Sequence, residues 1–208
     1  DVYKRQAVDI GNTNIVLGVL DGENLVYSGR FSTHIHQTVE ECAMNLYSFL
    51  NIHSIGKIDG AIISSVVPAL VSTVKGAVKL VTGVHALVVG PGIKTGLSIK
   101  IDDPAQLGAD LVVGAVAAKE KYPQPTIIFD LGTATTGTVL DKDGCCIGGM
   151  IAAGVKSSIN ALSTGTAQLP QIDISAPKKI IGTNTIDCMK SGTVIGTAVM
   201  IDLSLIHI

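Results

Sequence analysis

Two short apolar segments of the chain end in the same way, with an aspartate, a glycine two residues later, and then small hydroxyl or amide side chains. One is Asp9-Ile10-Gly11 in AVDIGNTN, and the other is Asp130-Leu131-Gly132 in IIFDLGTATT. A carboxylate at the end of a strand can bind Mg²⁺, and a glycine lets the backbone approach a phosphate closely. Hydrogen-bond donors follow each glycine, namely Asn12, Thr13 and Asn14 in the first copy and Thr133, Thr135 and Thr136 in the second. The pair therefore indicates two phosphate-binding turns that together hold a nucleotide.

The surroundings of the two copies also match. Val19-Leu20-Asp21 after the first copy corresponds to Val139-Leu140-Asp141 after the second, with a slip of one residue. A repeat of this kind predicts two similar lobes. The alternative is that both copies are ordinary β-turns whose Asp and Thr side chains cap the local backbone.

A third candidate site is Gly108-Ala109-Asp110, directly before an apolar helical segment. An aspartate at this place can accept the proton of a hydroxyl group that attacks a phosphate, and the helix N-terminus favours its ionised form. From the residues alone a plain helix N-cap is the favoured interpretation, because aspartate is common at that position. The residues alone leave both interpretations open.

The segments that must position these groups alternate between strand and helix patterns. A strand is expected over 7–11, a hairpin over 13–31 with its turn at Asp21-Gly22, and further strands over 61–67 and 85–90. Thr38 and Glu41 have capping-box spacing before one helix, and Pro68 opens another that carries Val71, Val74, Val78 and Val81 on one stripe. Residues 90–97 read as a loop, and the helix over 109–122 is apolar almost all round, which predicts burial. The pattern indicates an α/β fold with a largely parallel sheet.

Composition narrows the class of protein. Among the 208 residues, 15 Lys and Arg stand against 17 Asp and Glu without a basic stripe, so nucleic acid is not an expected partner. No apolar run approaches the ~18 residues of a membrane span, and no signal peptide is visible, so neither membrane nor export is expected. The four cysteines, Cys42, Cys145, Cys146 and Cys188, form no C-x-x-C pair and are expected to be reduced thiols in the cytoplasm.

The two ends of the chain mirror one another at the level of DNA. DVYKRQ can be encoded by a sequence whose reverse complement encodes LSLIHI, the last six residues. This is typical of translated sequencing adapter. We therefore expect residues 1–6 and 203–208 to be non-native and to contribute nothing specific to the core, with the native chain continuing past Asp202.

Seven segments together resemble one family. DIGNTN, ISSVVPAL, VVGPGIKTGL, DDPAQLGAD, FDLGTATT, GGMIAAG and NTIDCMKSG occur in the same order as in the type III pantothenate kinases of the acetate kinase, sugar kinase, Hsp70 and actin superfamily. The resemblance implies an α/β fold of two duplicated ribonuclease H-like lobes, each a mixed sheet flanked by helices, with the nucleotide cleft between them. It implies an N-terminal lobe over 7–110 and a C-terminal lobe over 111–202 that is incomplete.

The same resemblance implies an activity, the ATP-dependent phosphorylation of pantothenate to 4′-phosphopantothenate in coenzyme A biosynthesis. It assigns Asp110 as catalytic base and a cytoplasmic homodimer as the working form. ATP phosphate and Mg²⁺ are assigned to Asp9, Ile10, Gly11, Asn12, Thr13, Asn14, Ile15 and Val16, a further ATP contact to Thr133, and potassium or ammonium to Asp130. Pantothenate is assigned to Ile101, Gly108, Ala109, Asp110, Leu111 and Thr185.

Three positions depart from the family pattern. Leu111 stands where the family usually has arginine, Ile101 where a pocket tyrosine is common, and Ala153 where proline is usual. Leucine cannot supply the donors of a guanidinium group. The departures at Leu111 and Ile101 favour, as the alternative, a non-catalytic nucleotide-binding relative of the Bvg accessory factor kind, whereas Ala153 is expected to be only a change in a loop. Two other patterns predict no site: VVGPGIKTG lacks P-loop spacing, and the histidines of THIH read as a surface loop.

Overall fold

The computed structural model describes residues 3–90 and 92–206. It divides into two compact units, one built from residues up to 95 together with 105–113, and the other from 96–104 together with the residues from 114 onward. The lobes predicted from the sequence, 7–110 and 111–202, are single continuous segments, whereas each unit of the structure consists of two segments. The boundary between the lobes stays a prediction. Pro91 of the predicted loop over 90–97 lies outside the described residues.

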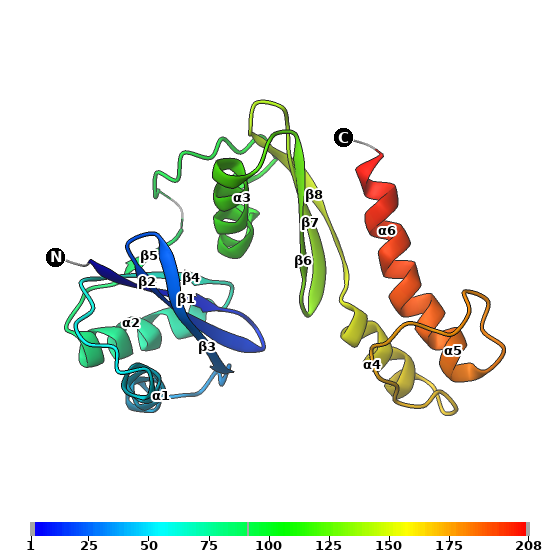
Figure 1. Ribbon diagram of the computed structural model, residues 1–208, viewed down its shortest axis with the longest axis horizontal. Helices are drawn as coiled ribbons and strands as arrows, with labels where there is room; N and C mark the ends of the chain where they lie inside the picture. Colours follow the sequence, from blue (N-terminus) through cyan, green and yellow to red (C-terminus); the bar gives the residue numbers. More distant parts are fainter. Residues whose placement is uncertain (1–2, 91, 207–208) are drawn as a thin grey trace. The chain divides into compact units, whose positions relative to one another are not determined.

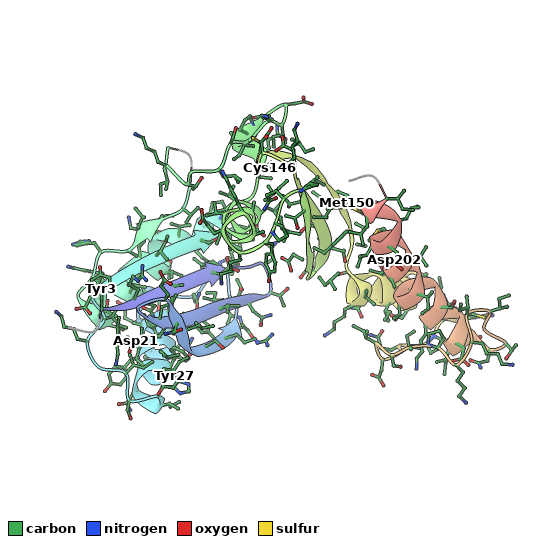
Figure 2. All side chains as sticks on the ribbon, turned by 45° about the horizontal axis from the view of Figure 1, so that its top comes forward. Tyr3, Asp21, Tyr27, Cys146, Met150 and Asp202 are labelled. Carbon is green, nitrogen blue, oxygen red and sulfur yellow. The ribbon has the colours of Figure 1, made fainter. Side chains whose placement is uncertain are left out.

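The first unit is a sheet covered by two helices. Its elements are β1 (Lys4–Ile10), β2 (Asn14–Asp21), β3 (Asn24–Ser32), α1 (Val39–Ile52), β4 (Gly60–Ser65), α2 (Pro68–Thr82) and β5 (Leu87–Val88). The strand order is β3-β2-β1-β4-β5. The strands β1, β2 and β3 are antiparallel neighbours, and the hairpin between β2 and β3 turns after Asp21 (Figure 2). The strands β1, β4 and β5 are parallel. The sheet is therefore mixed, and the parallel part is smaller than the sequence pattern predicts.

The core of this unit lies between the sheet and the pair of helices α1 and α2 (Figure 1). Alternate residues of β1 and β2 point into it, and α2 contributes Leu70, Val74, Ala77 and Val78. The predicted capping box is confirmed, because the Glu41 N–H donates to Thr38 Oγ1 at 3.2 Å and the Thr38 N–H to Glu41 Oε2 at 2.8 Å. The predicted strand over 85–90 is much shorter, since only Leu87 and Val88 pair with β4.

Residues near the start of the chain form part of this core, so the expectation that residues 1–6 contribute nothing specific is wrong. The first strand begins at Lys4, whose N–H donates to Asp59 Oδ2 at 3.1 Å. Gln6 is fully buried, in line with Val8 and Ile10 on the inward face of β1. Neither polar atom of its side chain has a hydrogen-bond partner within the described residues. An unpaired amide thus interrupts an otherwise apolar row.

Replacing this amide should stabilise the protein. A buried polar group without a partner costs about 1–3 kcal/mol, and leucine has nearly the same volume. We expect Gln6→Leu to raise the free energy of unfolding by an amount of that order in chemical denaturation. The matched control is Gln168→Leu at an exposed position, which should change stability by no more than about 0.5 kcal/mol. Equal effects of the two substitutions would contradict the burial cost.

The second unit repeats the first hairpin and then becomes helical. Its elements are η1 (Pro104–Gln106), α3 (Ala109–Lys121), β6 (Thr126–Leu131), β7 (Ala134–Leu140), β8 (Cys146–Ala153), α4 (Val155–Gly165), α5 (Thr185–Lys190), η2 (Ser191–Ile195) and α6 (Gly196–Leu205), of which η1 and the start of α3 straddle the division. The sheet is antiparallel in the order β6-β7-β8. Cys146 opens β8 and Met150 lies further along it (Figure 2).

The slip of one residue between the two sequence copies arises in the turn that follows the first strand of each copy. Three residues, 11–13, separate β1 from β2, whereas only Gly132 and Thr133 separate β6 from β7. Both turns are closed by the same kind of bond, from the Gly11 N–H to the Asn14 carbonyl and from the Gly132 N–H to the Ala134 carbonyl, each at 3.0 Å. The second turn is thus the first with one residue fewer.

The helix α3 is not buried all round, which corrects the expectation from its composition. Only Ala115 and Ala118 are buried, and Val113 is 42% exposed. A hollow of about 500 Å³ lies between α3 and β6, lined on the helix side by Gly114 and Ala117 among others. The side chains on this face are too small to fill the space up to the strand, so an apolar composition does not enclose the helix.

The last helical stretch is long and apolar, and few of its residues are buried. The elements α5, η2 and α6 run together over Thr185–Leu205, and η2 is a π-helical turn within them. By length and composition alone this stretch passes as a membrane span, with a mean hydropathy of 1.2 and 11% burial. A single helix of this kind does not by itself indicate a membrane protein. Its 21 residues nevertheless differ from the expectation that no apolar segment approaches the length of a membrane span.

Candidate phosphoryl-transfer site

The first phosphate turn lies at the carboxyl end of β1. Asp9 is exposed there, followed by half-buried Gly11 and exposed Asn12 and Thr13. Ile10 and Ile15 flank the turn and are both fully buried in the core. Their buried side chains therefore fix both ends of the turn to the core.

Among the residues assigned to ATP, the members of this turn divide by their exposure. Ile10 and Ile15 can meet a phosphate only through their main chain, because their side chains are enclosed. Asn14 is half-buried, and Val16, which pairs with Asp9 across the sheet, is 41% exposed. The polar and exposed part of the turn is thus confined to Asp9, Asn12 and Thr13.

The second turn places Asp130 in the same position at the end of β6. Asp130 is exposed and pairs with Thr136 across β6 and β7, so the two side chains project from the same face of the sheet. The Thr136 hydroxyl is buried and has no hydrogen-bond partner in the described part of the chain. A carboxylate beside an unpaired hydroxyl is a set of oxygen donors that suits a hard cation.

The aspartate of the third candidate site belongs to the first unit. Asp110 is half-buried in the first turn of α3, and its Oδ1 accepts a hydrogen bond from the Leu111 N–H at 2.8 Å. A Cβ added at Gly108 would lie 2.5 Å from Asp110 Oδ1 and 3.7 Å from Val66. Val66 in turn donates its N–H to the Ile10 carbonyl at 3.0 Å. The Gly108–Asp110 segment is thus linked, through Val66, to the end of β1 that carries Asp9.

These distances explain why a glycine stands at position 108. A methyl group there would push against the Asp110 carboxylate, which is the mobile end of a side chain, so the carboxylate would move rather than the backbone. We expect Gly108→Ala to leave the melting temperature nearly unchanged and to lower kcat about ten- to a hundredfold, because small displacements of a reacting group are costly. Gly114→Ala is the matched control, since its added Cβ meets nothing within 4 Å. Equal kinetics of the two variants would contradict this role.

The remaining residues assigned to pantothenate lie in different parts of the structure. Ile101 belongs to the second unit and is half-buried, and exposed Thr185 opens α5 in the same unit. Ala109 and Leu111 belong to the first unit together with Asp110. Gly108, Ala109, Asp110 and Leu111 therefore lie together because they are neighbours in the sequence. The assignment of Ile101 and Thr185 to the same pocket stays a prediction.

Two hydroxyl residues of the turns were not predicted from the sequence. The Thr33 hydroxyl donates to the Gly11 carbonyl at 2.7 Å, and the Thr33 N–H donates to the Thr13 carbonyl at 2.9 Å. In the second turn, the Ser157 hydroxyl donates to the Thr133 carbonyl at 2.7 Å. The partners lie 22 and 24 positions apart, so no local pattern indicates them.

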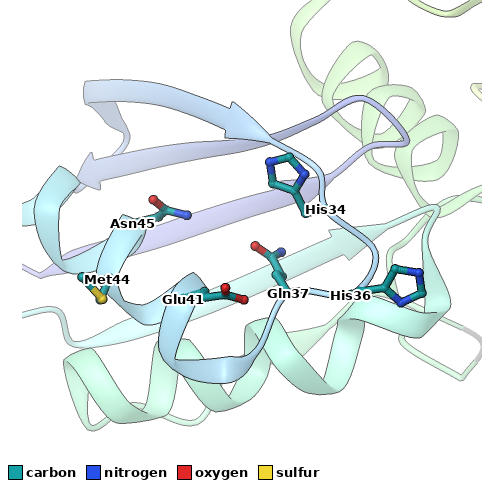
Figure 3. Close-up of a pocket in the computed structure, with 6 residues that line it drawn as sticks. All are labelled: His34, His36, Gln37, Glu41, Met44 and Asn45. Atoms are coloured by element: carbon teal, nitrogen blue, oxygen red, sulfur yellow. The ribbon is translucent and has the colours of Figure 1, made fainter.

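A separate hollow of about 510 Å³ follows Thr33 along the chain (Figure 3). Its lining includes His34, His36, Gln37 and Glu41 and none of the residues assigned above. The histidines lie on a surface loop, as expected, and no group of three metal-ligating side chains occurs in the described part of the chain. A Mg²⁺ ion held by one carboxylate and by nucleotide phosphates needs no such group, so Asp9 fits that role.

Two of the cysteines are enclosed thiols. All four are free, and Cys42 and Cys146 are enclosed in the two cores. Burial raises the pKa of the Cys42 thiol to about 11 and raises that of Cys146 as well. Thiols with raised pKa values stay protonated and unreactive near neutral pH.

Comparison with known proteins identifies the family of the chain. A sequence model described as type III pantothenate kinase matches residues 6–205. A type III pantothenate kinase of Exiguobacterium sp. is 42% identical over 198 residues, which is 94% of this chain and 78% of the relative. One from Halalkalibacterium halodurans is 43% identical over 197 residues, with the same two shares. A Campylobacter jejuni crystal structure, described as a Baf family transcriptional activator, covers 95% of this chain and 77% of its own at a TM-score of 0.62 and 16% identity.

Two hairpins with an aspartate-glycine turn and an aspartate at the start of α3 occur in a chain whose sequence matches are those of a kinase. The structural neighbour supports the fold alone, whereas the sequence matches are specific. The chain belongs to the type III pantothenate kinase family.

Proposed function

We propose that this protein transfers the γ-phosphoryl group of ATP to the terminal hydroxyl of pantothenate, giving 4′-phosphopantothenate, the first step of coenzyme A biosynthesis. Membership of the type III pantothenate kinase family carries the proposal. The relatives at 42% and 43% identity are named as kinases, whereas the Baf-described structure is 16% identical. A non-catalytic regulatory role is therefore not favoured.

In this proposal the chain's own residues divide the work between two phosphate turns and one base. The exposed ends of the turns, at Asn12, Thr13 and Thr133, contact the phosphates of ATP. Asp9 holds Mg²⁺, which neutralises phosphate charge when it is bound, and Asp130 with Thr136 holds potassium or ammonium. Asp110 aims the pantothenate hydroxyl and accepts its proton, because Oδ2 is not used by the bond from Leu111 to Oδ1.

Substrate recognition is assigned to residues around that base. Gly108 and Ala109 leave room beside the Asp110 carboxylate, and Ile101, Leu111 and Thr185 complete the pantothenate pocket in a cytoplasmic homodimer. Leu111 and Ile101 replace a polar guanidinium and a phenol of the family pattern, so they offer apolar contact only. We therefore expect pantothenate to be held by fewer direct hydrogen bonds here than in relatives that keep both.

The direct test measures ADP release by the full chain with ATP and Mg²⁺, with and without pantothenate. Pantothenate-dependent ADP release, together with 4′-phosphopantothenate identified by mass spectrometry, supports the proposal. Nucleotide binding without any pantothenate-dependent release would overturn it and favour the regulatory alternative. Light scattering of the same sample tests the homodimer.

A further inference from the structure

The two phosphate turns are held by the same device. In the first unit, Thr33 follows β3, and its hydroxyl and N–H donate to the carbonyls of Gly11 and Thr13 at 2.7 and 2.9 Å. In the second unit, Gly154 and Ser157 follow β8, and both donate to the Thr133 carbonyl, at 3.0 and 2.7 Å. In each case the donors come directly after the third strand of the sheet, so the device belongs to the duplicated hairpin.

These bonds determine which way the peptide units of the turns point. A peptide unit is planar and trans, so its carbonyl and its N–H point in opposite directions. When Thr33 holds the Gly11 carbonyl, the Asn12 N–H is fixed on the other side. When Ser157 holds the Thr133 carbonyl, the same follows for the peptide between Thr133 and Ala134. Carbonyl oxygens that would repel a phosphate are thereby directed toward a donor instead.

The second turn has an additional indication of close fit. A Cβ added at Gly154 would collide with the carbonyl oxygens of Gly132 and Thr133, so the chain after β8 lies directly against this turn. Gly154 is buried, and Ser157 follows it in the first turn of α4. The hydroxyl therefore reaches the turn from a rigid helix.

We propose that Thr33 and Ser157 are matched positioning residues, which act through the carbonyls they hold to keep the two turns in the conformation that receives nucleotide phosphates. This deepens the proposed function and rests on it for the identity of the nucleotide. Neither side chain needs to touch the reacting atoms. Removing either hydroxyl should weaken nucleotide binding and leave the pantothenate KM unchanged.

The test uses substitutions that keep shape and remove one hydrogen bond each, Thr33→Val and Ser157→Ala. Binding of a non-hydrolysable ATP analogue with Mg²⁺ is measured by calorimetry on the full chain without pantothenate. We expect the Kd to rise about three- to tenfold in each variant, the size of one lost hydrogen bond, and the effects to multiply in the double variant. Thr33→Ser and Ser157→Thr keep the hydroxyl and should restore the parent Kd.

Two controls separate positioning from general destabilisation. Thr82→Val and Thr164→Val each remove a hydroxyl that donates to a helix carbonyl, at 2.7 and 2.8 Å, one in each unit and away from the turns. They should leave the Kd unchanged. Parent-like Kd values in both turn variants, or equal changes in the controls, would overturn the inference. Because binding is measured without pantothenate, a failure of the pantothenate assay affects only the proposed function.

Discussion

Replacing Asp110 with asparagine should lower kcat about 10²–10⁴-fold while nucleotide binding stays near the parent value. Asparagine keeps the size and can still accept the hydrogen bond that Oδ1 receives from the Leu111 N–H. It cannot accept the proton of the attacking hydroxyl. A loss of turnover without a loss of binding therefore separates a general base from a helix cap.

The measurement is steady-state ADP release with pantothenate, combined with the melting temperature of each variant. Asp102→Asn makes the same chemical change at an exposed position eight residues earlier and should be silent. If the Asp110 variant turns over like the parent, the aspartate serves only the N-terminus of α3. A lower melting temperature with normal kcat would lead to the same conclusion.

The second large effect concerns the two strand-end aspartates, which we expect to serve different cations. Asp9→Ala should lower kcat/KM for Mg·ATP about 10²–10³-fold, the usual cost of losing an electrostatic contact to a reacting phosphate. Asp130→Ala should abolish activation by potassium or ammonium. Thr136→Val, which removes only the unpaired hydroxyl opposite Asp130, should raise the concentration of monovalent cation needed for half activation.

Titration of each variant with Mg²⁺ and with potassium distinguishes these roles. Asp143→Ala, at an exposed turn position of the same sheet, is the control for loss of an acidic side chain. An Asp130→Ala enzyme that potassium still activates would refute the cation assignment. A Thr136→Val variant with unchanged activation would confine it to the carboxylate.

Features set by neighbouring residues were predictable from the sequence. The capping box of Thr38 and Glu41 depends on side chains three positions apart, and Pro68 at the start of α2 needs no distant partner. The two aspartate-glycine turns were identified because each is a continuous segment at a strand end. Their shared turn bond and the missing residue in the second follow directly from that repeat.

Features set by distant residues were not predictable in the same way. The exposure of α3 depends on whether β6 comes close enough to cover a face of glycine and alanine, which composition does not reveal. The strand β5 pairs with β4 over only Leu87 and Val88, although β4 itself is six residues long. The hydroxyls of Thr33 and Ser157 donate to carbonyls that lie more than 20 positions away in the sequence. A threonine after a strand gives no sign of such a partner.

The π-helical turn η2 changes which sides of α5 and α6 face the same way in the long C-terminal helix. A π turn accommodates one residue more than the α turn it replaces, and one residue corresponds to about 100° of rotation in an α-helix. Met189 of α5 and Thr193 of η2 are buried, whereas α6 buries no residue. The extra residue therefore rotates the sides of α6 relative to those of α5 by about 100°, within the same unit. Deleting one residue within Ser191–Ile195 would realign both halves on a single face.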